Sequence, residues 1–281
     1  MLKVAVPNKG ALAESAALML AEAGYRQRRN AKDLVTVDAD NDVEFFYLRP
    51  RDIAIYVGEG TLDVGITGRD LLLDSGAHAD EVLTLGFAAS TFRYAAMAGT
   101  MTTESDLDGK RIATSYPGIV ASNLASLGLS ADVVRLDGAV ETSIRLGVAD
   151  AIADVVETGT TLRQAGLETF GQPILSSEAV VITRRGAASP TGFDVFRRRL
   201  ESVIVARTFV MMDYDIRSES VAEAVRLTPG IESPTVSALH REGWSAVRAM
   251  VPRDATQRVM DDLYLLGARG IIVTDILSCR V

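Results

Sequence analysis

The chain has 281 residues, of which 48% are hydrophobic and 23% charged, a composition typical of a globular protein with a sizeable core. No stretch approaches the roughly 18 continuous apolar residues of a membrane span, and the first apolar run, Leu2–Val6, is too short for a signal peptide. A formal net charge of −8 argues against nucleic acid as a partner. The single cysteine, Cys279, can form neither an internal disulfide nor a zinc site alone, so a cytoplasmic location is expected.

Up to about residue 185, short apolar segments alternate with helical ones. Gly24 is expected to end the first helix, as glycine commonly does. The alternation predicts an α/β fold with a mainly parallel, covered sheet. The expected strands are Leu2–Val6, Val43–Leu48, Val64–Thr67, Arg111–Thr114, Val133–Leu136 and Ala151–Val156, with helices at Ala11–Ala23 and Asp52–Val57.

Two parts of this region echo each other. Residues 52–66 and residues 141–152 both contain a helical segment, a Gly-x-x-Asp sequence and a buried strand. The echo indicates two similar α/β lobes around a cleft, the preferred place for a ligand. Chance repetition of one such unit within a single sheet is the alternative.

Beyond the turn-rich segment Gly186–Gly192, the pattern changes. A basic helix at Phe193–Val205 is followed by six elements in the order βαββαβ, which is the ferredoxin-like split unit. Such a small unit at the end of an enzyme-sized body is expected to be regulatory, although an oligomerisation domain is the competing interpretation. The six elements are expected at Phe209–Asp213, Ser218–Arg226, Thr235–His240, Trp244–Val251, Ala255–Leu266 and Ile271–Ile276.

The segment Ala151–Leu162 carries the strongest chemical signal. A buried strand ends at Asp154 and Glu157 and leads into Thr158-Gly159-Thr160-Thr161, which opens a helix. Gly159 permits a tight turn in which backbone N–H groups converge on an anion, and the threonine hydroxyls add donors. The two carboxylates are placed to accept ribose hydroxyls or to hold Mg²⁺. A capped strand-to-helix turn would explain the Thr-Gly-Thr-Thr alone, but with the acidic pair the pattern favours a phosphoribosyl site.

Three cationic residues follow strands of the first half. Lys9, Arg49 and Arg69 each stand at a strand-to-helix joint, the usual rim of an α/β cleft, and together they could surround a polyphosphate. Each alone would more often be a solvated surface charge. The ATPase P-loop is absent from the sequence, and with His78 and His240 as the only histidines a Ser-His-Asp triad has little material.

The sequence resembles the ATP phosphoribosyltransferase family over essentially its whole length. The resemblance rests on segments that occur in the family's order: Val6–Gly10, Leu48–Pro50, Asp63–Gly68, Arg111–Pro117, Leu136–Glu141, Ala149–Leu162, Thr228–Gly230 and Ser233–Thr235. It implies a two-lobed catalytic body like that of periplasmic binding proteins, followed by an ACT-like domain. The implied domains are lobe I at 1–90 with a return segment at about 180–205, lobe II at 91–179, and the ACT-like domain at 206–281.

The resemblance also implies the reaction and the roles of residues. ATP and 5-phosphoribosyl 1-pyrophosphate (PRPP) would give N1-(5-phosphoribosyl)-ATP and pyrophosphate, with Mg²⁺ as cofactor. Glu157, Thr158, Gly159, Thr160 and Thr161 would hold the 5-phosphate, and Asp154 and Glu141 would face the ribose and the metal. Lys9, Arg49, Arg69 and Asp70 would lie on the ATP and pyrophosphate side, where Tyr116 is a candidate to stack on a base. In the tail Asp215, Thr235 and Gly270 match a pocket for L-histidine as inhibitor, in a homo-oligomer that shifts between dimer and hexamer.

Three alternatives to this enzyme are open at the level of sequence. A solute-binding protein would also have two lobes around a cleft but no use for a phosphate loop. A nucleobase phosphoribosyltransferase usually carries two adjacent acids before its loop, whereas Asp154 and Glu157 are separated. A catalytically inactive regulatory subunit would be expected to have lost the loop.

Overall fold

The structure is a computed structural model that describes residues 1–30, 32–156 and 159–281. It divides into two compact units, one of residues 1–18 and 25–194 and one of residues 19–24 and 195–281. The helix α1 (Ala11–Glu22) contributes to both.

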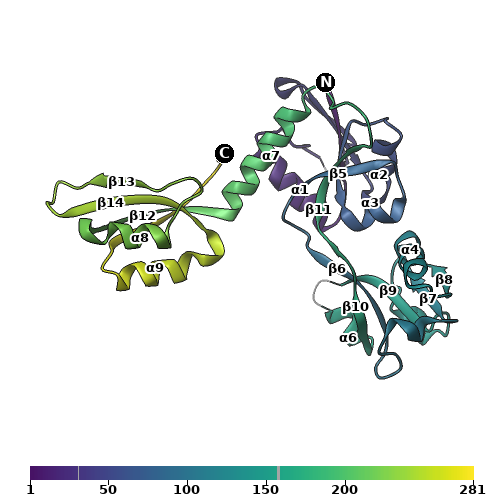
Figure 1. The fold of residues 1–281 in the computed structure, drawn as a ribbon. Coiled ribbons are helices and arrows are strands. Elements are labelled where there is room, and N and C mark those ends of the chain that lie inside the picture. Colours follow the sequence, from purple (N-terminus) through teal and green to yellow (C-terminus); the bar gives the residue numbers. More distant parts are fainter. Residues whose placement is uncertain (31, 157–158) are drawn as a thin grey trace. The chain divides into compact units, whose positions relative to one another are not determined.

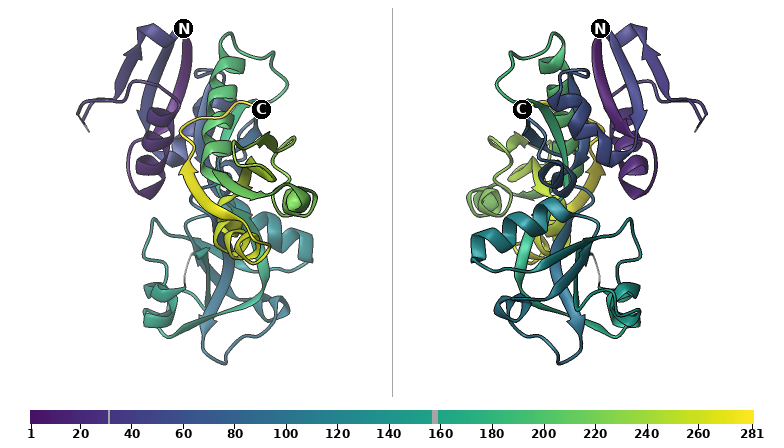
Figure 2. Two further views of the ribbon diagram at one scale, coloured as in Figure 1. Left: turned by 90° about the vertical axis from the view of Figure 1, so that its left-hand side faces the viewer. Right: turned by 90° about the vertical axis from the view of Figure 1, so that its right-hand side faces the viewer.

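The first unit contains two sheets, which remain separate in all views of Figures 1 and 2. Lobe I is built on six strands in the order β2-β3-β1-β4-β11-β5. Its parallel strands β1, β3 and β4 carry near-continuous apolar runs, and α2 packs Ile53 and Val57 into the core beneath them. The elements of lobe I are β1 (Leu2–Pro7), β2 (Val35–Asp38), β3 (Val43–Leu48), α2 (Pro50–Gly58), β4 (Val64–Gly68), α3 (Arg69–Ser75), β5 (Ala79–Thr84) and β11 (Ala179–Arg184).

Lobe II is built on five strands in the order β10-β6-β9-β7-β8. Strands β7, β8 and β9 run parallel, and their apolar side chains pack with the helix α4 around Ile112, Val120 and Ala153. The elements of lobe II are β6 (Ser90–Met97), β7 (Arg111–Thr114), α4 (Pro117–Leu127), β8 (Asp132–Arg135), α5 (Thr142–Arg145), β9 (Ala151–Val156), α6 (Thr160–Gln164) and β10 (Leu167–Ser177).

The internal echo in the sequence corresponds to a structural repeat. Asp63 precedes β4 and its Oδ2 accepts the backbone N–H of Lys3 at 2.9 Å, while Asp150 precedes β9 and its Oδ2 accepts the N–H of Arg111 at 2.9 Å. In both lobes the aspartate therefore ties the start of one parallel strand to the start of its neighbour. The prediction of two similar α/β lobes is confirmed.

The prediction of mainly parallel sheets was wrong, because both sheets are mixed. Strand β11 runs antiparallel to β4 and β5, and β6 runs antiparallel to β9 and β10. The chain passes from β5 to β6 and returns from β10 to β11 through short crossing segments without a crossover helix. Strand β5 leaves lobe I and β11 returns to it, so these neighbours run in opposite directions, and the same holds for β6 and β10 in lobe II.

The second unit holds the C-terminal ferredoxin-like domain. Its four strands pair antiparallel throughout in the order β13-β14-β12-β15. Helices α8 and α9 cover one face, where Met212, Tyr214 and Leu263 are buried (Figure 1). The predicted βαββαβ order is confirmed, with β12 (Phe209–Arg217), α8 (Val221–Leu227), β13 (Thr235–Ala238), β14 (Trp244–Pro252), α9 (Thr256–Leu265) and β15 (Arg269–Asp275). The basic helix α7 (Phe193–Thr208) precedes it.

Candidate functional site

The carboxyl ends of three parallel strands meet at one edge of lobe I. Because β1 pairs parallel with both β3 and β4, the joints that follow these strands lie side by side. Lys9, Arg49 and Arg69 occupy those joints, as the sequence predicted. Lys9 and Arg49 are exposed. This edge is where open α/β sheets place ligands.

Lobe II has an equivalent edge. Tyr116 follows β7 and is the N-cap residue of α4, Glu141 follows β8 and is the N-cap residue of α5, and Asp154 lies near the end of β9. Since β7 pairs parallel with β8 and β9, these three residues share one edge of the sheet. The structure thus brings together residues that lie up to 38 positions apart in sequence, from Tyr116 to Asp154.

A cavity of about 360 Å³ adjoins this edge. Both predicted carboxylates and the described part of the phosphate loop line it: Glu141, Asp154, Gly159, Thr160 and Thr161. Gly159 has φ of +68°, the left-handed conformation that favours glycine, and it is the N-cap residue of α6. Glu157 and Thr158, also predicted to hold phosphate, lie outside the described residues.

The surroundings of Asp154 disfavour the ionised form of its carboxyl group. Burial raises its pKa above the ordinary 3.8, and the nearby charges of Glu141 and Asp70 raise it further, while hydrogen bonding from Val155 N–H at 2.8 Å and the charge of Arg51 lower it. Carboxylates that repel each other in a partly buried place favour a bound cation. Among the described residues no group of three or more His, Cys, Asp or Glu could hold a metal ion, whereas Glu141 and Asp154 form a pair on the cavity.

Tyr116 is enclosed by residues of both lobes. The Arg51 guanidinium of lobe I lies 5.0 Å from its ring centroid, and Phe92 of lobe II packs edge-on at 5.2 Å. Burial, the charge of Asp70 and a hydrogen bond with Asp70 raise the pKa of the Tyr116 hydroxyl. Tyr116 and Asp70, both predicted to lie on the ATP side, are therefore neighbours across the two lobes.

Arg69 lies at the crossing between the lobes. Its guanidinium pairs with Glu81 at 2.7 Å and Glu178 at 3.3 Å and donates to the Ser176 carbonyl at 3.2 Å. The Glu178 carboxylate also accepts the N–H of Gly86 from the other crossing segment at 3.1 Å. Hydrogen bonding to Glu81 raises the pKa of Arg69. In this structure Arg69 joins the crossing segments, and its predicted contact with pyrophosphate would require an exchange of these partners.

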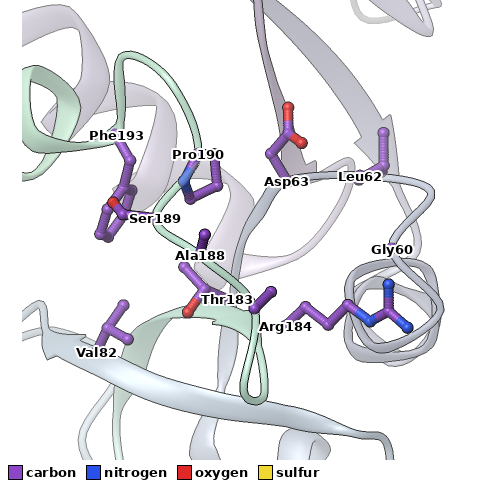
Figure 3. Close-up of a pocket in the computed structure, with 11 residues that line it drawn as sticks. Gly60, Leu62, Asp63, Val82, Thr183, Arg184, Ala188, Ser189, Pro190 and Phe193 are labelled. Carbon is purple, nitrogen blue, oxygen red and sulfur yellow. The ribbon is translucent and has the colours of Figure 1, made fainter.

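A second hollow, of about 390 Å³, lies at the opposite end of the lobe I strands (Figure 3). It adjoins Asp63, which precedes β4, and Arg184, which ends β11, whereas Arg69 and Asp70 follow β4 at its other end. Leu62, Pro190 and Phe193 supply apolar lining. None of the predicted site residues lines it, and we do not regard it as the candidate active site.

The residues predicted to bind histidine lie on the sheet face of the C-terminal domain that α8 and α9 leave open. A Cβ atom placed on Gly270 would be 3.7 Å from Asp215 Oδ2, so these two residues adjoin across β15 and β12. Thr235 is farther away: it pairs with Arg248 of β14, whose neighbour on β12 is Asp213. The structure thus brings Asp215 and Gly270 together and leaves Thr235 two strands from β12 on the same face.

Reasoning from sequence missed three polar residues that surround the predicted ones. Arg51 covers Tyr116, Asp74 accepts the N–H groups of Gly118 and Ile119, and the Ser177 hydroxyl donates to Asp70. Arg51 directly follows Leu48–Pro50, a segment that carried the family resemblance, and could have been found beside it. Asp74 and Ser177 contact residues 44 and 107 positions away, respectively, and no local pattern signals such contacts.

Comparison with known proteins agrees with this architecture. A family model described as ATP phosphoribosyltransferase matches residues 49–203, and one described as the HisG C-terminal domain matches residues 206–278. ATP phosphoribosyltransferases from Arthrobacter sp. (strain FB24) and Streptomyces avermitilis are 63% and 64% identical, with all of each chain covered. A solved structure, the ATP phosphoribosyl transferase (HisG:HisZ) complex from Thermotoga maritima, matches with a TM-score of 0.64 and 29% identity, over 73% of this chain and 98% of that one.

These matches define the class of protein first: an α/β pentosyltransferase with an added C-terminal domain. The chain belongs to the ATP phosphoribosyltransferase family, which acts in histidine biosynthesis. Among the described residues, no helix is both long and apolar enough to cross a membrane.

Proposed function

We propose that the chain transfers the phosphoribosyl group of PRPP to N1 of ATP in a Mg²⁺-dependent reaction that releases pyrophosphate. The observation that carries the proposal is the cavity that Glu141, Asp154 and Gly159–Thr161 line together. A left-handed glycine followed by two threonines presents N–H and hydroxyl donors to a phosphate. The carboxylates of Glu141 and Asp154, which line the same cavity, could accept hydrogen bonds from the ribose hydroxyls of PRPP.

The residues fit a magnesium ion that is shared with the substrate. Mg²⁺ is usually held by one or two carboxylates plus substrate phosphates rather than by a complete protein cage. Asp154 and Glu141 supply such a pair, and a cation would offset the burial and the charge repulsion that raise the pKa of Asp154. When bound, the ion would neutralise charge on the pyrophosphate leaving group.

The chemistry requires positioning and electrostatics more than a base. Adenine N1 attacks the anomeric carbon with its own lone pair; the N1–C bond forms, the bond from that carbon to pyrophosphate breaks, and its electron pair leaves with pyrophosphate. Positive charge grows on the ribose meanwhile, and the Asp154 carboxylate faces that charge from the cavity. Lys9 and Arg49, exposed at the lobe I edge, are placed to bind phosphates of ATP and pyrophosphate, and Asp70 and Tyr116 to orient the adenine.

The C-terminal domain would provide feedback control. An ammonium group of L-histidine would pair with Asp215, whose neighbour Gly270 leaves its backbone accessible, while Thr235 would contribute from β13. The open sheet face also suits assembly into a homo-oligomer, between dimer and hexamer, without a separate regulatory subunit. We place the enzyme in the cytoplasm, with ATP, PRPP and histidine rather than nucleic acid as its partners.

Turnover by the purified full chain tests the proposal. With Mg²⁺, ATP and PRPP it should release pyrophosphate and form a product with the mass of N1-(5-phosphoribosyl)-ATP, and L-histidine should suppress both. Thr161→Val should mainly raise the KM for PRPP. Turnover with a free nucleobase but not with ATP would establish the nucleobase enzyme instead, and no turnover with either would indicate an inactive subunit.

A further inference from the structure

Asp74 is a nearly buried carboxylate that the proposed reaction does not use. It lies in lobe I on α3, one helical turn after Asp70, so both side chains project from the same side of that helix. Its side chain is only 8% exposed. A charged group in such a place needs strong partners.

The partners of Asp74 come from both lobes. Its Oδ2 pairs with Arg51 Nη1 of lobe I at 2.9 Å. Its Oδ1 accepts the backbone N–H groups of Gly118 at 2.8 Å and Ile119 at 3.3 Å, in the first turn of α4 in lobe II. These N–H groups have no partner within their own helix, and a carboxylate from the other lobe satisfies them.

The approach of α3 to α4 leaves no room for a side chain. A Cβ atom added at Gly118 would collide with the Asp74 carbonyl oxygen. Tyr116 directly precedes this turn as the N-cap residue of α4, and Arg51, held by Asp74, covers its ring. The contacts of Asp74 therefore fix both Tyr116 and the Arg51 guanidinium that packs on its ring.

We infer that Asp74 is a positioning residue for the adenine side of the site: it fastens α4 to α3 and so holds Tyr116 against Asp70 and Arg51. The inference rests on the proposed function, in which ATP lies between residues of both lobes and the phosphate of PRPP lies on the loop of lobe II. The phosphate loop, Glu141 and Asp154 all belong to lobe II, so they do not need the fastening to keep their mutual geometry. Loss of Asp74 should consequently affect the two substrates unequally.

The experiment compares Asp74→Ala, Asp74→Asn and a control, Asp80→Ala, in the full-length enzyme. Asp80 is also an ion-paired aspartate of lobe I, 2.7 Å from Arg185, but the pair is about half exposed and Arg185 is not a residue of the proposed site. Asp74→Ala should raise the KM for ATP about tenfold, the usual scale for a lost charge-assisted hydrogen bond, and leave the KM for PRPP within about twofold. Asp74→Asn keeps an acceptor for the α4 amides but loses the charge that holds Arg51, so its effect should be intermediate. The control should match the wild type.

Hydrogen exchange of the peptide that contains Gly118 and Ile119, measured without substrates, provides a second readout. Exchange there should be faster in Asp74→Ala than in the wild type and the control. An unchanged KM for ATP, an equal rise for both substrates, or unchanged exchange would overturn the inference. If instead Thr161→Val leaves the KM for PRPP unchanged, the proposed loop site fails, and the role of Asp74 is still decided by exchange and by the KM for ATP.

Discussion

The hydroxyl group of Ser177 donates a 2.8 Å hydrogen bond to Asp70 Oδ1 and accepts the backbone N–H of Asp70 at 3.0 Å. Ser177 ends β10, just before the chain returns to lobe I, and Asp70 is the second residue of α3. Both residues are buried. The crossing segment therefore sets the orientation of a carboxylate that hydrogen-bonds Tyr116.

Replacement of this hydroxyl should affect stability and ATP binding together. Ser177→Ala leaves a donor and an acceptor of Asp70 without their partner in a buried place, which costs about 1–3 kcal/mol of unfolding free energy. We also expect a higher KM for ATP, because Asp70 is then free to turn away from Tyr116. Denaturant unfolding and steady-state kinetics check both effects. The control is Ser126→Ala, since the exposed Ser126 hydroxyl donates only to Asn123 O of its own helix, and unchanged ATP kinetics in Ser177→Ala would contradict the orienting role.

Gly159 and Gly109 have the same left-handed backbone conformation, so substitutions at the two positions distinguish the effect of backbone strain from the loss of phosphate binding. Gly159 in the phosphate loop has φ of +68° and Gly109 has φ of +69°, with no atom near a Cβ added at Gly109. Alanine at either position should cost about 1–2 kcal/mol of stability because of the left-handed backbone. Gly159→Ala alone should raise the KM for PRPP, by about tenfold if one charge-assisted hydrogen bond to phosphate is lost. A similar KM change in Gly109→Ala would show that general strain, not the loop, is responsible.

The pKa shifts of two aspartates predict opposite effects of amide substitution. Burial, with the charges of Glu141 and Asp70, raises the pKa of Asp154 above 3.8, so its ionisation opposes folding at pH values above the shifted pKa and not below 3.8. Asp154→Asn should therefore raise the thermal midpoint of the unliganded protein near pH 7, lose that advantage as the pH falls towards 3.8, and abolish turnover. A lower midpoint near pH 7 would contradict this electrostatic account.

Asp150 is the matched control, because its pKa is shifted in the opposite direction to that of Asp154. Hydrogen bonding to Arg111 lowers its pKa to about 2, so its ionised form stabilises the fold above pH 3.8 and this contribution disappears as the pH falls through about 2. Asp150→Asn should lower the free energy of unfolding near pH 7 by less than about 1 kcal/mol, because the pair is well exposed to solvent. The thermal midpoint should fall accordingly. Turnover should persist, since Asp150 lies at the start of β9, away from the proposed site.

The sequence was most informative about features that depend on contiguous residues and not on tertiary contacts. Short, mainly apolar runs identified the parallel strands: the bounds of β3, β7 and β9 were predicted as observed, and those of β1, β4 and β8 to within one residue. The Gly-x-x-Asp echo identified the two lobes. Strands β2, β5, β6, β10 and β11 were not predicted. Polar and apolar residues mix in β5 and β10, and the pairing of the last four strands depends on the crossings between lobes. The same limit applies to the site: the loop residues are contiguous, whereas Asp74, Ser177 and the partners of Arg69 depend on tertiary packing.

The last prediction concerns control by histidine. Asp215→Ala removes the carboxylate beside Gly270 and should weaken inhibition by L-histidine at least tenfold, because the ammonium group of the ligand loses its charged partner, while leaving uninhibited kcat and both KM values unchanged. The comparison variant is Asp275→Ala, which removes a carboxylate from β15 that pairs with Arg253 at 2.8 Å and does not adjoin Gly270. Inhibition curves at fixed substrate, together with a direct titration of histidine, measure the effect. Equal inhibition of Asp215→Ala and the wild type would move the histidine site elsewhere on the domain, and equal weakening in both variants would indicate a disturbed sheet, not a lost ligand contact.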